Sequence, residues 1–337
     1  MAAPLACIFG CDGTALTGDE QRLFRETDPL GFILFQRNCE SPSQVRALIA
    51  DMRRCVGRQD APVLVDQEGG RVQRLKPPTW RKAPAAAVIG DLATRNLPGA
   101  IEAARLNARL IAEELVALGF NADCAPVLDL RLPITHKAIG DRAYSDDPAI
   151  VTALGRAACE GFIAGGIIPV LKHMPGHGRA VADSHIELPR VSAPADELAR
   201  TDFVPFRALR DMPWAMTAHI LFTTLDAAAP ATASKSIIEN VIRGAIGFHG
   251  LLFSDDLSMQ ALEGTLGQRA ARALAAGCDV ALHCNGKMDE MRQVAESVPP
   301  LTPAAMERVA AGLRIVDAGE RIDIAAVQAR FEALLAA

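Results

Sequence analysis

Aromatic side chains are scarce in this sequence. Only 4% of the 337 residues are Phe, Trp or Tyr, although half of the residues are hydrophobic. A core built from this chain must therefore be filled mainly by Ala, Leu, Val and Ile. Charged residues make up 22%, an ordinary share for a globular protein with a sizeable core.

An excess of positive charge and a long apolar run are also missing. The formal net charge is -5, which provides no basic surface of the kind that nucleic-acid binding requires. No apolar stretch is long enough to cross a bilayer, and the first residues lack the basic segment of a secretory signal. The sequence therefore predicts a cytoplasmic protein with neither a nucleic-acid nor a membrane partner.

The eight cysteines lack the paired spacing that is typical of metal sites. Cys7 and Cys124 lie inside apolar runs, where a free cysteine behaves as a small hydrophobic residue. Disulfide frameworks belong to short secreted chains. We therefore expect no metal site and no disulfide framework.

Short apolar runs alternate with longer amphipathic stretches along the whole chain. The predicted strands are residues 5–9, 31–35, 62–65, 124–128, 167–171, 215–218, 251–253 and 280–283, and the predicted helices include residues 43–55, 100–118, 150–164, 237–246 and 268–276. About eight alternations without a polar linker favour a single (β/α)8 TIM-type barrel, with residues 303–336 as extra C-terminal helices. A doubly wound sheet is the alternative. We expect one domain over residues 1–337.

Ionisable residues follow five of the predicted strands. In a parallel barrel the carboxyl ends of all strands meet at one face, where active sites are built. A single Asp in such a place can be a helix N-cap, but five polar strand ends favour a shared site. These residues are Asp66, Asp129, the pair Lys172 and His173, His219, and the pair Asp255 and Asp256.

The segment at residues 172–185 concentrates groups that transfer protons. Asp183 and His185 are one residue apart, so the carboxylate can fix the imidazole tautomer and make His185 a general acid/base. A serine hydrolase that uses Ser184 or Ser254 lacks the expected GxSxG turn. A zinc site built from the histidines is a stronger alternative, although no HExxH spacing supports it.

Two further segments suggest that the site acts on a sugar. Asp66 and Arg74 flank a glycine turn without phosphate-binding spacing. Such a pair can hold sugar hydroxyls, or it can be a surface ion pair of little energetic value. Asp255 and Asp256 end a strand, and a carboxylate there can attack an anomeric carbon. Neighbours on a strand point to opposite faces, so the sequence leaves open which of the two attacks.

Together these segments resemble the NagZ-type β-N-acetylglucosaminidases of glycoside hydrolase family 3. The resemblance runs from residues 31–38 through residues 66–72 and 253–259, and its most specific parts are residues 172–178 and 183–185. It implies that Asp255 is the nucleophile and that His185, held by Asp183, is the acid/base. It also implies that five residues bind the N-acetylglucosamine: Asp66, Arg74, Arg142, Lys172 and His173.

The resemblance implies a retaining, exo-acting β-N-acetylglucosaminidase. Its substrates would be peptidoglycan fragments, GlcNAc-1,6-anhydroMurNAc with or without peptide, in cell-wall recycling. We expect a monomer that needs no cofactor. There are three alternatives, in this order: a phosphorylase that uses the same residues, a metal-dependent hydrolase, and a sugar-binding protein without activity.

Overall fold

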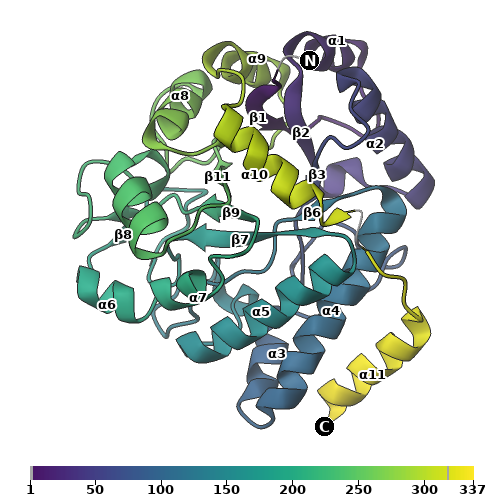
Figure 1. Cartoon of the computed structure of the whole chain (residues 1–337), viewed down its shortest axis with the longest axis vertical. Coiled ribbons are helices and arrows are strands. Elements are labelled where there is room, and N and C mark those ends of the chain that lie inside the picture. Colours follow the sequence, from purple (N-terminus) through teal and green to yellow (C-terminus); the bar gives the residue numbers. More distant parts are fainter. Residues whose placement is uncertain (1–2, 317–318) are drawn as a thin grey trace.

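The computed structural model describes residues 3–316 and 319–337. Eight parallel strands close into a barrel in the order β1-β12-β11-β9-β7-β6-β3-β2 (Figure 1). They are β1 (Leu5–Phe9), β2 (Pro29–Leu34), β3 (Val63–Val65), β6 (Ala122–Asp123), β7 (Ile168–Met174), β9 (Trp214–Thr217), β11 (Leu251–Asp256) and β12 (Val280–His283). The predicted TIM-type fold is confirmed.

Helices surround the barrel on its outer side (Figure 1). They are α1 (Gly18–Thr27), α2 (Pro42–Val56), α3 (Ala86–Ala93), α4 (Leu97–Leu118), α5 (Pro148–Ala164), α6 (Ala195–Arg200), α7 (Phe203–Ala208), the π-helix η4 (Ile237–Ala245), α8 (Leu266–Ala276) and α9 (Met288–Ser297). Short 3-10 turns are η1 (Gln36–Asn38), η2 (Gly140–Arg142) and η3 (Ala231–Ala233). Five of these ten helices begin at a residue with a capping side chain, such as Thr17 or Ser41, which accepts a hydrogen bond from the first turn.

The strand predicted at residues 124–128 is misplaced. The barrel strand β6 is Ala122–Asp123, and beyond it Val127 forms only an isolated bridge with Lys172. Pro126 interrupts the predicted run, and because proline has no N–H it cannot donate to a strand ladder. The other seven predicted strands overlap barrel strands, and residues 5–9 and 280–283 match β1 and β12 at both ends.

The few aromatic residues are concentrated in the core. Trp214 and Phe253 meet edge to face inside the barrel, with ring centroids 5.4 Å apart. Between strands and helices, the expected small and aliphatic side chains allow close packing. A Cβ added to Gly161 of α5 would lie 2.3 Å from the carbonyl oxygen of Arg105 in α4, so these two helices pack at near backbone contact.

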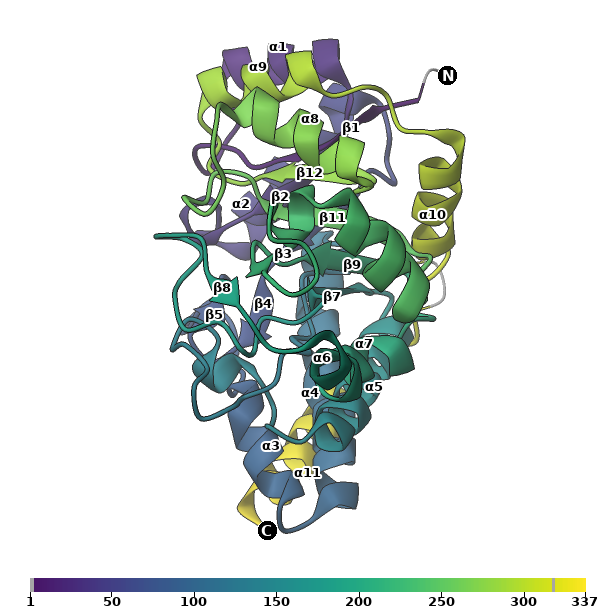
Figure 2. The same ribbon diagram turned by 90° about the vertical axis from the view of Figure 1, so that its left-hand side faces the viewer.

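Two C-terminal helices lie outside the alternating pattern, as expected. α10 (Pro303–Leu313) covers the amino-terminal end of the barrel (Figure 2), and the indole of Trp214 donates to the carbonyl of Arg308 at 3.4 Å. α11 (Ile324–Ala336) packs against α4. The predicted helical stretch also includes residues 317–318, which lie outside the described residues. None of the helices in the described ranges combines the length and the apolar character needed to cross a membrane.

Two small sheets stand at the opposite, carboxyl-terminal end of the barrel (Figure 2). One pairs β4 (Gln67–Gly69) with β5 (Val72–Gln73), and the other pairs β8 (Arg190–Val191) with β10 (Leu221–Phe222). They belong to the long loops that follow β3, β7 and β9. The loops after β3 and β7, together with the loop after β6, build the walls of the candidate site.

Candidate active site

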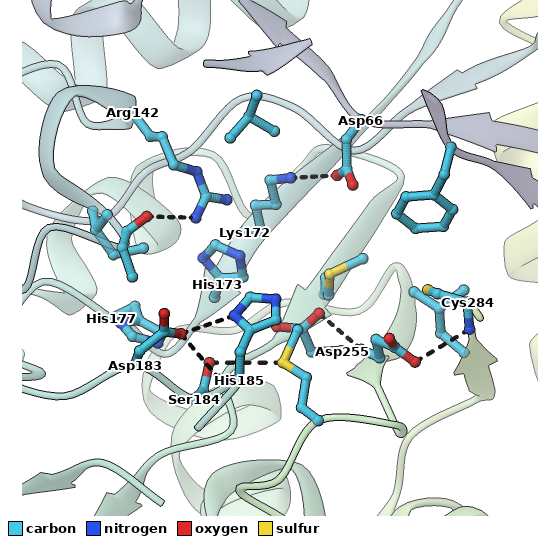
Figure 3. Close-up of a pocket in the computed structure, with 18 of the residues that line it drawn as sticks. Asp66, Arg142, Lys172, His173, His177, Asp183, Ser184, His185, Asp255 and Cys284 are labelled. Carbon is cyan, nitrogen blue, oxygen red and sulfur yellow. Dashed lines mark hydrogen bonds and ion pairs between the residues drawn. The ribbon is translucent and has the colours of Figure 1, made fainter. Parts of the chain in front are cut away.

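A cavity of about 360 Å³ lies at the carboxyl ends of the barrel strands (Figure 3). Its lining includes all eight residues that the sequence predicted for the site: Asp66, Arg74, Arg142, Lys172, His173, Asp183, His185 and Asp255. They come from β7, β11 and the loops after β3, β6 and β7. The structure thus brings together in one cavity residues that are far apart in the sequence.

A chain of alternating charges crosses one wall of this cavity. Asp66 accepts from Arg74 Nη2 at 2.8 Å through Oδ2 and from Lys172 Nζ at 2.8 Å through Oδ1. Lys172 Nζ also lies 2.6 Å from Glu68 Oε1. Arg142 completes the chain, because its Nη2 and Nε donate to the two oxygens of Glu68 at 2.8 and 2.9 Å. The pair of Asp66 and Arg74 is therefore part of a partly buried network and not an isolated surface ion pair.

Mutual attraction keeps these groups charged. Burial by itself raises the pKa of the Asp66 carboxyl, but Lys172 and Arg74 together hold that pKa well below its usual range. Burial likewise disfavours the charged form of Lys172, but Asp66 and Glu68 raise the pKa of its ammonium group above its usual value. At neutral pH the wall presents fixed ammonium, guanidinium and carboxylate groups, which suit the hydroxyls of a sugar.

Glu68 was not identified as a site residue from the sequence. It lies two residues after Asp66 in an extended segment, and alternate residues of a strand point to the same face. This two-residue spacing is the feature of the sequence from which Glu68 could have been predicted as a site residue. Its side chain is only 6% exposed and joins Lys172 to Arg142, so it holds two of the predicted sugar-binding residues in place.

The Glu68→Gln variant is expected to lower the free energy of unfolding by about 3 kcal/mol, because removal of one charge from a buried network leaves its partners incompletely compensated. Urea denaturation at neutral pH measures the change. Glu160→Gln is the matched control, since Glu160 forms a 2.7 Å pair with Arg105 that is nearly half exposed. That variant should lose at most about 1 kcal/mol. Equal losses in the two variants would contradict the role of burial.

Beneath the charged wall, Asp123 positions the segment that carries Asp66 and Glu68. Its Oδ1 accepts the backbone N–H of Gln67 at 2.9 Å, whereas its buried Oδ2 has no partner in the described part of the chain. The Gln67 side chain in turn accepts the backbone N–H of Arg74 at 2.9 Å. Burial raises the pKa of Asp123 to about 8, although the N–H of Gln67 opposes the shift.

This raised pKa predicts a pH effect on stability. In the unfolded chain an Asp ionises near pH 3.9, so between that pH and about 8 the folded state binds more protons at Asp123. Stability from this group must fall as the pH rises through that window. Asp123→Asn keeps an oxygen for Gln67 and cannot ionise. Relative to this variant, the wild-type free energy of unfolding should fall between about pH 5 and about pH 8. Denaturant titrations at several pH values measure it. A difference in unfolding free energy between the two proteins that stays constant with pH would exclude the effect.

His173 is oriented from below by Asp129. The Asp129 carboxylate is buried and lies 2.7 Å from His173 Nδ1, and it also accepts the backbone N–H of His177 at 2.6 Å. Because a carboxylate accepts, Nδ1 carries the hydrogen and Nε2 remains for a ligand. Burial, and secondarily the neighbouring His173, lower the pKa of His177 to about 4, so His177 is neutral at neutral pH.

The structure distinguishes the two adjacent aspartates of β11. Asp256 uses both carboxylate oxygens, because Oδ1 accepts from the backbone of Ser258 at 3.0 Å and of Cys284 at 3.2 Å, and Oδ2 accepts from the Ser258 hydroxyl at 2.6 Å. Asp255 is 7% exposed and accepts one backbone N–H through Oδ1. Its other oxygen is available to a ligand, which the sequence could not show.

Neighbouring groups keep Asp255 ionised. Burial raises the pKa of its carboxyl, but the neighbouring His173 and His219 lower that pKa below its usual value overall. His219 is buried behind it, with Nδ1 2.7 Å from the Thr232 hydroxyl and Nε2 3.0 Å from the carbonyl of Asp256. The arrangement supplies a carboxylate with one free oxygen at the floor of the cavity.

Asp183 and His185 form a pair at the rim of the cavity (Figure 3). Asp183 Oδ1 lies 2.8 Å from His185 Nδ1 and accepts the His185 backbone N–H at 3.0 Å. The side chain of His185 is 65% exposed, and that of Asp183 is 25% exposed. The neighbouring Ser184 also lines the cavity, and its hydroxyl lies 3.7 Å from Met259 Sδ. Across residues 3–316 and 319–337, no three His, Cys, Asp or Glu side chains are grouped so that they could hold a metal ion.

Comparison with known proteins identifies the family. The family model described as the glycosyl hydrolase family 3 N terminal domain matches residues 17–317. The chain belongs to glycoside hydrolase family 3. The resemblance found in the sequence is thereby confirmed.

Individual relatives show which kind of glycoside hydrolase this chain is. A beta-hexosaminidase of Alkalilimnicola ehrlichii is 40% identical over 282 residues, 82% of this chain and 80% of that protein. A beta-hexosaminidase of Pseudomonas aeruginosa is 40% identical over 281 residues, 82% of this chain and 81% of that protein. The crystal structure of native NagZ from Neisseria gonorrhoeae has a TM-score of 0.86 at 30% identity and covers 99% of this chain and 97% of that one. This family 3 member is a glycoside hydrolase, a β-N-acetylhexosaminidase, and acts on carbohydrate.

Proposed function

We propose that the enzyme is an exo-acting, retaining β-N-acetylglucosaminidase that removes terminal non-reducing GlcNAc from peptidoglycan fragments. The proposed substrate is GlcNAc-1,6-anhydroMurNAc, with or without its peptide, in cell-wall recycling. One observation carries the proposal: the Asp183–His185 pair lines the same cavity as the buried Asp255 and the charged wall. Residues 1–337 are proposed to form one catalytic domain that acts as a cytoplasmic monomer.

In the first proposed step, Asp255 attacks the anomeric carbon. The bond from that carbon to the leaving oxygen breaks, and His185 gives the oxygen a proton from Nε2. Asp183 holds Nδ1 and stabilises the imidazolium before the transfer. The product of this step is a glycosyl ester of Asp255 and a neutral His185.

In the second step, water displaces Asp255 from the anomeric carbon. Neutral His185 takes a proton from that water, so the carboxylate and the imidazolium are both restored. Two displacements at one carbon retain its configuration. The steps use side chains, water and substrate, and they involve no cofactor.

The charged wall is proposed to bind the sugar. Asp66 can accept from two hydroxyls and Arg74 can donate to one of them, while Lys172 and Arg142 donate from the same side. His173 can donate or accept through Nε2, which Asp129 leaves unoccupied. The buried ion pairs fix these groups before the ligand arrives, and such preorganisation favours binding.

Product analysis tests the proposed reaction. Incubation with GlcNAc-1,6-anhydroMurNAc, with and without peptide, should release free GlcNAc whose first-formed anomer is β by NMR. A first-formed α anomer would exclude retention. The same reaction in phosphate buffer checks for GlcNAc 1-phosphate. The relatives described above are named for hydrolysis and none for phosphorolysis, so the phosphorylase alternative has no support.

A further inference from the structure

A second cavity, of about 270 Å³, lies behind the segment that carries His185. It is bounded by β8 and β10, by the loop at residues 227–233, by the turn at residues 261–263 and by α8. Within the described part of the chain, no residue lines both this cavity and the active-site cavity. It is therefore a separate space that shares a wall with the active site.

The charged residues around the second cavity are mostly cationic. Arg190 reaches it from β8, and Arg269 and Arg272 reach it from α8. Among the described residues that line it, Glu263 is the only carboxylate. Because a guanidinium group is always charged at physiological pH and binds a carboxylate with two hydrogen bonds, the cavity favours an anionic group.

Apart from Thr232, the remaining lining is apolar. It includes Leu188, Leu221 and the Ala-Ala-Ala-Pro run at residues 227–230. Small-molecule sites combine an apolar lining with a few polar groups that orient the ligand. The matching ligand is a carboxylate on a short aliphatic body.

The shared wall is made of segments that also hold the active site. His185 faces the active-site cavity, whereas Leu188 faces the second one. Ala261 lines the second cavity, and its N–H donates to the carbonyl of Ser184 at 3.2 Å. Thr232 lines it too, and its hydroxyl is the 2.7 Å partner of His219, which stands behind Asp255.

Arg269 strengthens this connection. Its Nη1 donates to the carbonyls of Leu257 at 2.8 Å and Met259 at 2.9 Å, in the turn that follows Asp256. A ligand that contacts Arg269 would therefore contact the side chain whose hydrogen bonds hold that turn in place.

We propose that the second cavity is a regulatory binding site for a small aliphatic carboxylate, and that a ligand bound there slows turnover by restraining the segment at residues 183–188. His185 acts from an exposed position at the rim, so its segment must approach the leaving oxygen during the reaction. Contact with Leu188 and Arg190 opposes that movement. The kinetic part rests on the proposed function, whereas the binding part does not.

Calorimetric titration with hexanoate tests the binding part. Hexanoate should bind with a dissociation constant on the order of millimolar, and hexylammonium, which has the same body and the opposite charge, should not bind. The double variant Arg190→Gln/Arg272→Gln should bind hexanoate about tenfold more weakly, since it loses two charge-assisted contacts. In the wild type, hexanoate should lower kcat and leave KM unchanged.

The matched control is Arg22→Gln/Arg105→Gln, which removes two exposed arginines from α1 and α4. It should bind hexanoate as the wild type does. Equal loss of binding in both double variants, binding of hexylammonium, or competition between hexanoate and GlcNAc would each overturn the proposal. An enzyme without glycosidase activity would refute the proposed function, and the binding titration would still decide whether the second site exists.

Discussion

Asp255→Asn is expected to lower kcat by about 10⁴-fold or more. The amide is a poor nucleophile, so no glycosyl ester forms and the two-step route is closed. The buried position of Asp255 and its single free oxygen make it the better placed of the two aspartates in β11. Folding should be preserved, because the amide oxygen can still accept the backbone N–H that Oδ1 accepts now.

Trapping the intermediate provides the direct measurement. A fluorinated GlcNAc analogue with a good leaving group should label the wild type at Asp255, and fragmentation mass spectrometry should locate the mass increase on that residue. The matched variant is Asp256→Asn. Because both oxygens of Asp256 bind the chain itself, this change should reduce stability and leave the labelling of Asp255 intact.

Chemical rescue gives an independent check. Asp255→Ala opens space at the cavity floor, and azide should then attack the anomeric carbon in one displacement. The product would be the α-glycosyl azide, because a single displacement inverts the configuration. A label on Asp256, or a β-glycosyl azide, would show that Asp255 is not the nucleophile.

His185→Ala is expected to lower kcat/KM by about 10²–10⁴-fold for substrates with a sugar leaving group, since the leaving oxygen then departs without a proton. A dinitrophenol leaving group needs no protonation, so its release should be nearly unchanged. Rates across a series of aryl glycosides measure this difference. In the variant, the first step should become steeply dependent on the pKa of the leaving phenol.

The control for His185 is His249→Ala. His249 is exposed and precedes β11, which places it at the amino-terminal end of the barrel, away from the cavity. The His249→Ala variant should hydrolyse every substrate of the series at the wild-type rate. Asp183→Asn should give an intermediate loss with the same leaving-group pattern, because Asp183 acts through the imidazole. A uniform loss for every leaving group would instead indicate that His185 only binds the sugar.

The sequence predicted the barrel because strand and helix periods alternate without interruption. It failed at residues 124–128, where hydrophobic character suggested a strand but Pro126 lacks the N–H that a ladder requires. The helix at residues 237–246 was found, but its π-helical hydrogen bonding was not. That bonding depends on how the segment packs between neighbouring elements, and apolar spacing alone does not encode it.

For the site, the sequence supplied the residue types and the tertiary structure supplied their partners. Glu68 looked like an ordinary turn residue until the fold brought Lys172 and Arg142 to its two oxygens. Asp255 and Asp256 were equivalent by position. They differ because the turn after β11 and the residue that follows β12 direct hydrogen-bond donors at Asp256.

By itself, the sequence determined the fold class and the family, because these follow from local patterns and from motifs within short segments. It also predicted eight residues that line the cavity. The tertiary structure alone decided which carboxylate keeps a free oxygen, which charges neutralise one another and where His185 stands relative to the cavity. Hydrogen bonds and burial depend on groups distant in the chain, and closure of the barrel is what brings those groups within reach of one another.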